Sequence, residues 1–210
     1  MYEDFFPIGF KHDLIISIGG DGSMLATINK MKFQQIPIFG IHIGNLGFLN
    51  QCNKDNYESY LDKIFLKDTI KYIKYPLLES LFIDNNKKYK KILALNDLVI
   101  TQNENARLLN LDVNINNSLL NSFKCDGMIF STPMGSTAYS LSAGGPIVSP
   151  FVNSIIITPI SPHSLSSRPI VVNNNSIIKV VLPENFKSVC LSSDGQKLYN
   201  IMKDTNVEIK

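Results

Sequence analysis

Residues 13–25 read DLIISIGGDGSML, a strand that runs into a glycine turn and then into a helix. Residues 14–18 are apolar almost throughout, which is typical of a parallel strand covered on both faces. The three glycines around Asp21 tolerate positive φ and let a ligand approach the backbone closely. The turn follows the carboxyl end of the strand, where open α/β sheets bind their ligands. Asp21 is therefore a candidate functional residue, although an aspartate in such a turn can also be a plain turn residue or helix cap.

The pattern continues outward from this turn as an α/β unit. A helix over residues 22–32, a strand over 36–43 and a helix over 54–66 complete a βαβα series. A second glycine turn, at residues 44–49, follows the second strand. We expect the two turns to lie side by side, because the carboxyl ends of parallel strands meet at one edge of a sheet.

After about residue 70 the pattern changes to strands joined by asparagine-rich turns, which suit tight hairpins. We therefore predict an α/β + β fold, with a small Rossmann-like α/β domain over residues 1–69 and a larger β-rich, β-sandwich-like domain over residues 70–210. The strands expected in the second domain are 70–83, 90–101, 107–115, 119–123, 128–130, 154–157, 176–182, 188–192 and 206–209.

A second informative stretch, residues 131–148, reads STPMGSTAYSLSAGGPIV. Pro133 and Gly135 predict a tight turn, and the run from Ser136 has few helix breakers. We expect a helix to begin there, with free N–H groups that attract phosphate or ribose oxygens. The alternative is a serine-rich loop and helix cap without a ligand.

Length and composition indicate a small globular enzyme. Hydrophobic residues make up 44% and charged residues 18%, and the net charge of +2 is too small to indicate nucleic-acid binding. Three well-separated cysteines favour a reducing compartment over a zinc site, and no signal peptide or membrane-spanning apolar run is evident. We expect a cytoplasmic protein. The chain has no P-loop, no dinucleotide GxGxxG, no HExxH and no GxSxG motif.

Taken together, these segments resemble the NAD kinase family. The resemblance depends on the GGDG turn, on Asn96-Asp97, on Asp126-Gly127 and on the run at 131–148, and it extends to residues 162–169 and 194–196. The GGDG turn is shared with diacylglycerol, sphingosine and 6-phosphofructo-kinases, whereas the Ser/Thr/Gly run is specific. Met134 departs from the usual threonine. Twelve residues precede Asp13, where family members usually have a longer segment.

The resemblance implies a kinase that phosphorylates the 2′-hydroxyl of the adenosine ribose of NAD with ATP and Mg²⁺. A carboxylate is needed to take the hydroxyl proton, and Asp21 is the candidate base, because we expect the glycine turn to leave it uncrowded and reachable. No metal-ligating side chain is assigned. A homodimer or homotetramer with sites shared between subunits is also implied, without nucleic acid or membrane partners. The substrate contacts implied by the resemblance are Asp21, Gly22, Asn96, Asp97, Arg107, Lys124, Asp126, Thr137, Ala138, Tyr139, Ser140, Leu141, Ser142, Ser161 and Gln196.

Two other functions stay open at this point. The first is a protein that holds NAD or NADP without phosphorylating it, because the small α/β domain leaves the ATP side in doubt. The second is a lipid or sugar kinase that shares the GGDG turn, and the run at 131–148 disfavours it.

Overall fold

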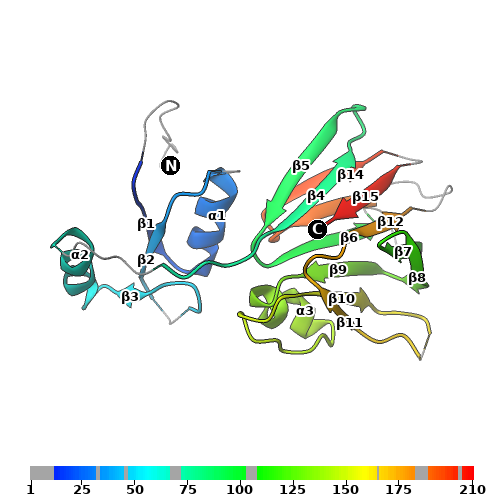
Figure 1. Ribbon diagram of the computed structural model, residues 1–210. Helices are drawn as coiled ribbons and strands as arrows, with labels where there is room; N and C mark the ends of the chain where they lie inside the picture. Colours follow the sequence, from blue (N-terminus) through cyan, green and yellow to red (C-terminus); the bar gives the residue numbers. More distant parts are fainter. Residues whose placement is uncertain are drawn as a thin grey trace. The chain divides into compact units, whose positions relative to one another are not determined.

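The computed structural model divides the chain into two compact units, residues 1–73 and 74–210, whose elements are labelled in Figure 1. The boundary predicted between residues 69 and 70 lies outside the described residues. The structure describes residues 12–31, 34–44, 47–66, 72–102, 108–164, 166–182, 189–202 and 205–210.

The first unit is a small parallel sheet with two helices. Its elements are β1 (Ile15–Gly19), α1 (Asp21–Met31), β2 (Ile38–His42), β3 (Cys52–Asn53) and α2 (Tyr57–Leu66). The strands lie in the order β1-β2-β3 and all run parallel. The predicted βαβα series is therefore present. The extra strand β3 escaped prediction because two residues are too few to show a hydrophobic pattern.

One expectation about β1 is wrong. The strand was expected to be covered on both faces, but Ile16 is 42% and Ile18 is 59% exposed. These two side chains share a face with Phe39 and Ile41 of β2. The residues of α2 pack on Phe39, Ile41 and Cys52, so this helix covers β2 and β3 and leaves that face of β1 open.

The second unit contains two six-stranded, antiparallel sheets. The first has the order β11-β10-β9-β6-β13-β14, and the second has the order β5-β4-β15-β12-β7-β8. The strands of the first sheet are β6 (Asp97–Gln102), β9 (Gly127–Ser131), β10 (Ser154–Ile160), β11 (Ile170–Asn173), β13 (Val189–Ser193) and β14 (Lys197–Ile201). The strands of the second are β4 (Leu78–Ile83), β5 (Tyr89–Ala94), β7 (Leu109–Ile115), β8 (Ser118–Cys125), β12 (Ile178–Val181) and β15 (Asn206–Ile209).

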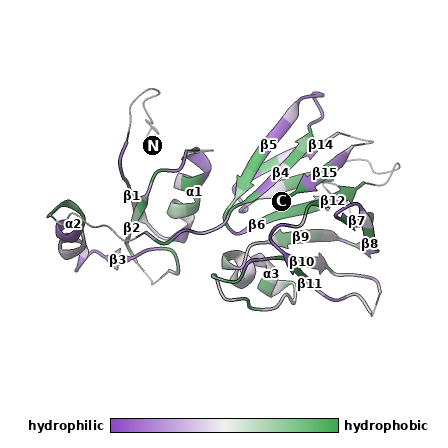
Figure 2. Cartoon of the chain, viewed as in Figure 1, coloured by the Kyte–Doolittle hydropathy of each residue, from purple (hydrophilic) through white to green (hydrophobic). Residues whose placement is uncertain are grey.

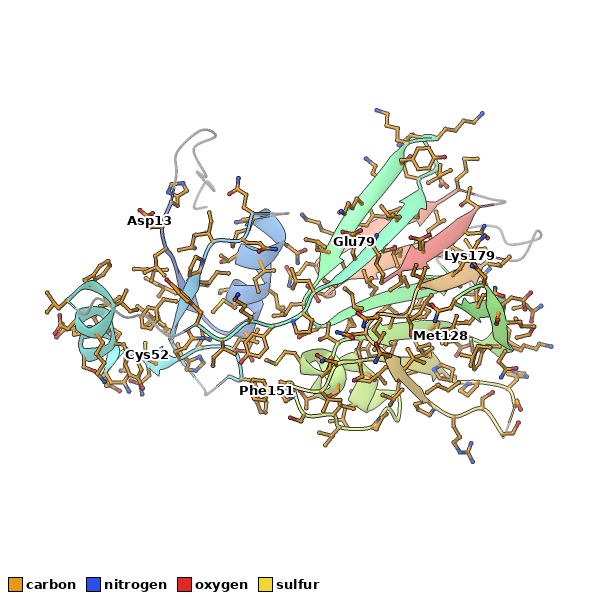
Figure 3. The ribbon with its side chains drawn as sticks, viewed as in Figure 1. Asp13, Cys52, Glu79, Met128, Phe151 and Lys179 are labelled. Atoms are coloured by element: carbon orange, nitrogen blue, oxygen red, sulfur yellow. The ribbon has the colours of Figure 1, made fainter. Side chains whose placement is uncertain are left out.

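The two sheets share one hydrophobic core, as a β-sandwich does. Leu98, Met128 and Ile157 from the first sheet pack in one cluster with Phe82 and Val113 from the second. In Figure 2 hydrophobic colour runs along β6 and β9, while the tip of the β4–β5 hairpin is hydrophilic. Met128 on β9 and Glu79 on β4, both labelled in Figure 3, mark the two sheets. The predicted β-sandwich-like domain is confirmed.

The outer face of the first sheet is also covered. The side chains of Val99, Ile129 and Ile156 are buried but lie outside the sandwich core, on the opposite face of β6, β9 and β10. The 3₁₀ helix η1 (Met134–Thr137) and helix α3 (Tyr139–Ser142) both contact β9. The hydroxyl of Ser140 in α3 lies beside that of Thr158, which shares the outer face of the sheet with Ile129. The serine-rich run therefore forms a lid on this sheet.

Three predicted elements differ from the structure. The strand expected over residues 90–101 is two strands, β5 and β6, which belong to different sheets. The helix expected from Ser136 is two short pieces, because Ala138 between them has non-helical angles (φ −92°, ψ −132°). Strands β11 and β14 were not predicted, and within the described residues of the expected strand 70–83 only Leu78–Ile83 is β structure. No helix in the described ranges is both long and apolar enough to cross a membrane.

Candidate functional site

The chain crosses from one sheet of the sandwich to the other over residues 95–97, a segment that we call the crossing. Leu95 and Asn96 lie between Ala94, the last residue of β5, and Asp97, the first residue of β6. Their carbonyl groups are bound from one side by Thr132, whose hydroxyl donates to Leu95 O (2.6 Å) and whose N–H donates to Asn96 O (2.9 Å). The side chain of Asn96 is only partly buried, so the crossing presents an amide at the surface of the domain.

Asp97 lies under the lid and is 4% exposed. It pairs across the sheet with Ser131, and its carboxylate accepts a hydrogen bond from the backbone N–H of Tyr139 at the start of α3. Burial, and after it the negative charge of Asp194, raises the pKa of Asp97 to about 7. The carboxyl group of Asp97 therefore changes charge close to neutral pH.

The lid is fixed to the crossing and to the sheet by close contacts. A Cβ atom on Gly135 would overlap the backbone of Asn96, with its Cα at 2.6 Å, so glycine is needed for this approach. The buried hydroxyl of Ser140 lies 2.9 Å from the Thr158 hydroxyl on β10. The lid residues Thr137, Tyr139, Leu141 and Ser142 are exposed, and Ala138 is partly buried. The hydroxyl of Ser140 thus holds the lid to the sheet, and its neighbours on either side remain available to a ligand.

Three further predicted residues gather around the end of β8. Lys124 and Asp126 are exposed there, and the N–H of Asp126 donates to Ile160 O (2.9 Å). Ser161 follows Ile160 and has a positive φ of 46°. The N–H of His163 donates to Lys124 O (2.8 Å), so the segment after β10 is bonded to the end of β8. These contacts place Lys124, Asp126 and Ser161 together.

The crossing and this second group lie at opposite ends of β9. Asp97 pairs with Ser131 at one end of the strand, whereas Asp126 directly precedes Gly127 at the other. At about 3.3 Å per residue, the backbone positions 126 and 131 are about 16 Å apart. The structure therefore sorts the predicted residues of this unit into two groups rather than one.

The predicted base, Asp21, is the first residue of α1 in the other unit. Its carboxylate accepts hydrogen bonds from the N–H groups of Phe48 (2.9 Å) and Leu49 (3.1 Å), which belong to the second glycine turn. A Cβ on Gly47 would collide with the same carboxylate. The two turns do lie side by side, as predicted. The expectation that Asp21 is uncrowded is wrong, because both of its oxygens hold this loop. Gly22 beside it is exposed.

Two of the predicted residues belong to neither group, and two residues that hold the crossing were not predicted. Arg107 lies outside the described residues, and Gln196 is exposed in the turn between β13 and β14. Thr132 and Asp194 were not predicted as site residues, although both hold the crossing. Asp194 has a positive φ of 50°, and the following Gly195 has φ 63°. The Asp-Gly pair therefore indicated a turn, but it gave no sign that the carboxylate of Asp194 binds the crossing.

Comparison with known proteins identifies the relatives of both units. The model of the ATP-NAD kinase C-terminal domain matches residues 95–210, and that of the N-terminal domain matches residues 7–69. NAD kinase of Thermoanaerobacter sp. (strain X514) is 40% identical over 191 residues, covering 91% of this chain and 67% of the relative. NAD kinase of Syntrophotalea carbinolica is 36% identical over 184 residues, covering 88% and 64%. The chain thus spans about two thirds of the length of such relatives.

Solved structures agree with this. Yeast NADH kinase complexed with NADH has a TM-score of 0.85 and 32% identity, covering 95% of this chain and 58% of that one. An NAD kinase from Archaeoglobus fulgidus in complex with ATP has a TM-score of 0.79 and 30% identity, covering 94% and 74%. With both family models matched in order along one chain, the protein belongs to the ATP-NAD kinase family.

Proposed function

We propose that the protein is an NAD kinase that transfers a phosphoryl group from ATP to the 2′-hydroxyl of the adenosine ribose of NAD. The observation that carries this proposal is the crossing at Asn96-Asp97, where an accessible amide and a carboxyl group with near-neutral titration lie beneath the serine-rich lid. Sequence relatives named NAD kinase and the likeness to structures that hold NADH or ATP support it.

Asn96 and Asp97 suit recognition of a nucleoside. The amide of Asn96 both donates and accepts hydrogen bonds, so it can bind a base edge or a sugar hydroxyl. An ionised Asp97 accepts from a hydroxyl. Exposed Thr137, Tyr139 and Ser142 of the lid add hydroxyl groups on the same side of the sheet. We assign the adenosine end of NAD to this group of residues.

Lys124, Asp126 and Ser161 then serve the other end of a dinucleotide. Because they lie at the far end of β9, one NAD molecule need not touch both groups of the same chain. A homodimer or homotetramer, in which one copy supplies the second group to its neighbour's site, is the arrangement we propose. The partly shared site implied by the family resemblance is consistent with this separation.

We propose Asp21 as the general base. A carboxylate has about four lone-pair positions, and the N–H groups of Phe48 and Leu49 occupy two of them. The remaining positions can accept the proton of a ribose hydroxyl. The two backbone donors also fix the orientation of the carboxylate, which general-base catalysis requires.

Mg²⁺ is proposed to arrive with ATP. Within the described ranges no group of three or more His, Cys, Asp or Glu side chains could hold a metal ion. In kinases Mg²⁺ is commonly bound chiefly through the phosphates of the donor. When bound, the ion would neutralise charge on the transferred phosphoryl group.

The direct test supplies purified protein with NAD, ATP and Mg²⁺ and measures NADP with a coupled dehydrogenase. The variant Asp21→Asn removes the base and should lower turnover by about 10²–10⁴-fold. Asp62→Asn, an exposed aspartate on α2, is the matched control and should leave turnover unchanged.

A binding protein without kinase activity is the second candidate, because the proposed substrate contacts other than Asp21 and Gly22 all lie in the second unit. Such a protein would show a higher thermal midpoint with NAD or NADP but would form no NADP. If neither dinucleotide shifts the midpoint at millimolar concentration, both candidate functions are wrong.

A further inference from the structure

The crossing at Leu95–Asp97 is held on its second side by one carboxylate. Asp194 accepts hydrogen bonds from three successive backbone N–H groups: Leu95 (3.0 Å), Asn96 (2.7 Å) and Asp97 (3.1 Å). The N–H of Asp194 in turn donates to Asp97 O (3.0 Å). Hydrogen bonds to a charged group are stronger than those between neutral groups.

With Thr132 on the other side, every backbone polar group of the crossing has a partner. Thr132 binds the carbonyl groups of Leu95 and Asn96, and Asp194 binds the remaining four groups. The segment has no freedom to rotate without losing one of these bonds. The backbone position of Asn96 is therefore set by two residues that are themselves almost fully buried.

We propose that Asp194 is a positioning residue of the dinucleotide site: its carboxylate fixes the backbone that presents Asn96, and its charge acts on the neighbouring carboxyl group of Asp97. This inference rests on the proposed function. Asp194 is the first residue of the turn that follows β13, and it is buried, whereas Gln196 in the same turn is exposed. The proposed role of Asp194 therefore requires no contact with the ligand itself.

Three groups face the carboxyl group of Asp97, and the charge of Asp194 is the one that favours its neutral form. The strand β9 contributes the Ser131 hydroxyl, α3 contributes the Tyr139 N–H, and the turn after β13 contributes the Asp194 carboxylate. The Ser131 hydroxyl is buried and finds no hydrogen-bond partner among the described residues. After burial, the charge of Asp194 is the other influence that raises the pKa of Asp97 to about 7, whereas the Tyr139 N–H lowers it.

The consequence for binding has a definite direction. If the ionised form of Asp97 accepts a hydroxyl of NAD, affinity rises as the pH increases through about 7. Replacing Asp194 by a neutral residue removes the repulsion, so the pKa of Asp97 falls and the inflection moves to lower pH. The same replacement loosens the crossing and weakens binding at every pH.

The experiment measures the dissociation constant of NAD by calorimetry, without ATP, from pH 6 to pH 8.5. For Asp194→Asn we expect affinity at pH 8.5 to fall at least about tenfold and the inflection to move down by on the order of one pH unit. The matched control, Thr132→Val, removes a hydroxyl from the opposite side of the crossing without changing charge. It should weaken binding and leave the inflection in place.

The possible outcomes separate the two proposals. An inflection that is the same in the parent and Asp194→Asn, or that moves equally in Thr132→Val, overturns the role of the Asp194 charge. A parent protein that binds neither NAD nor NADP overturns the proposed function and this inference with it. Should Asp194→Asn fail to fold, Asp194→Glu keeps the charge and disturbs the geometry, so it should weaken binding while the inflection stays near that of the parent; a displaced inflection there contradicts the proposal.

Discussion

Asp97→Asn should make the stability of the protein less sensitive to pH. The pKa of Asp97 is raised from 3.8 to about 7, first by burial and then by Asp194. The folded state therefore binds this proton more tightly than the unfolded chain does. Asp97 therefore increases the free energy of unfolding at low pH, and this increase is lost as the pH rises from about 4 to about 7. At 1.36 kcal/mol per pH unit, the full difference is about 4 kcal/mol.

The asparagine variant removes this titration at little structural cost, because its amide oxygen can still accept the Tyr139 N–H. We expect the parent and the variant to be about equally stable near pH 4. The variant should become more stable than the parent as the pH rises, by up to about 4 kcal/mol at pH 8. Carboxyl groups such as Glu79 act in the opposite direction: although burial opposes it, the pairing of Glu79 with Lys91 and Lys210 lowers its pKa. Their contribution cancels in the comparison of the two proteins.

Urea unfolding followed by circular dichroism measures this difference, since the chain contains no tryptophan for fluorescence. Asp112→Asn, at an exposed position on β7, is the control and should track the parent at every pH. If the difference between Asp97→Asn and the parent is the same at pH 5 and pH 8, the carboxyl group of Asp97 does not titrate near neutral pH and the reasoning is refuted.

Three further outcomes are expected. Ser80→Ala should raise the free energy of unfolding by about 1 kcal/mol in a urea titration, because the buried Ser80 hydroxyl has no hydrogen-bond partner among the described residues; a loss of stability would contradict this. Gly135→Ala should weaken NAD binding in calorimetry, since the new Cβ displaces the backbone of Asn96; unchanged affinity would show that the crossing tolerates movement. Light scattering should give two or four times the chain mass, and a monodisperse, active monomer would refute the shared site.

Much of the fold was visible in local sequence. The glycine turn after β1 and the asparagine-rich turns between later strands depend on residues next to one another, so their patterns could be read directly. The break between β5 and β6 could not be read in the same way. Residues 90–101 form a continuous strand-like pattern, and the chain turns there because Asp194 and Thr132, far away in sequence, satisfy its backbone groups.

The residues of the candidate site also differ in whether local sequence could predict them. Asn96, Asp97 and the lid residues could be named because they form a recognisable motif, whereas Asp194 was seen only as part of an Asp-Gly turn. Its role depends on three hydrogen bonds that span 97 to 99 residues of sequence. The helix expected after Ser136 failed for a related reason. Hydroxyl groups such as those of Ser136 and Ser140 bond to the backbone at Pro133 and to Thr158, so the segment follows the sheet surface instead of a helical period.

Asp21 shows how the structure changes the meaning of a mutation. From sequence, a turn aspartate replaced by asparagine should be nearly neutral, because both residues cap and turn well. In the structure each carboxylate oxygen accepts a separate N–H, from Phe48 and from Leu49, and an amide has only one oxygen to offer. Asp21→Asn should therefore lower stability by about 1 kcal/mol even if Asp21 has no catalytic role. A modest fall in thermal midpoint thus reports the loop contact, and only a loss of turnover of about 10²-fold or more, beyond what that fall explains, reports the base.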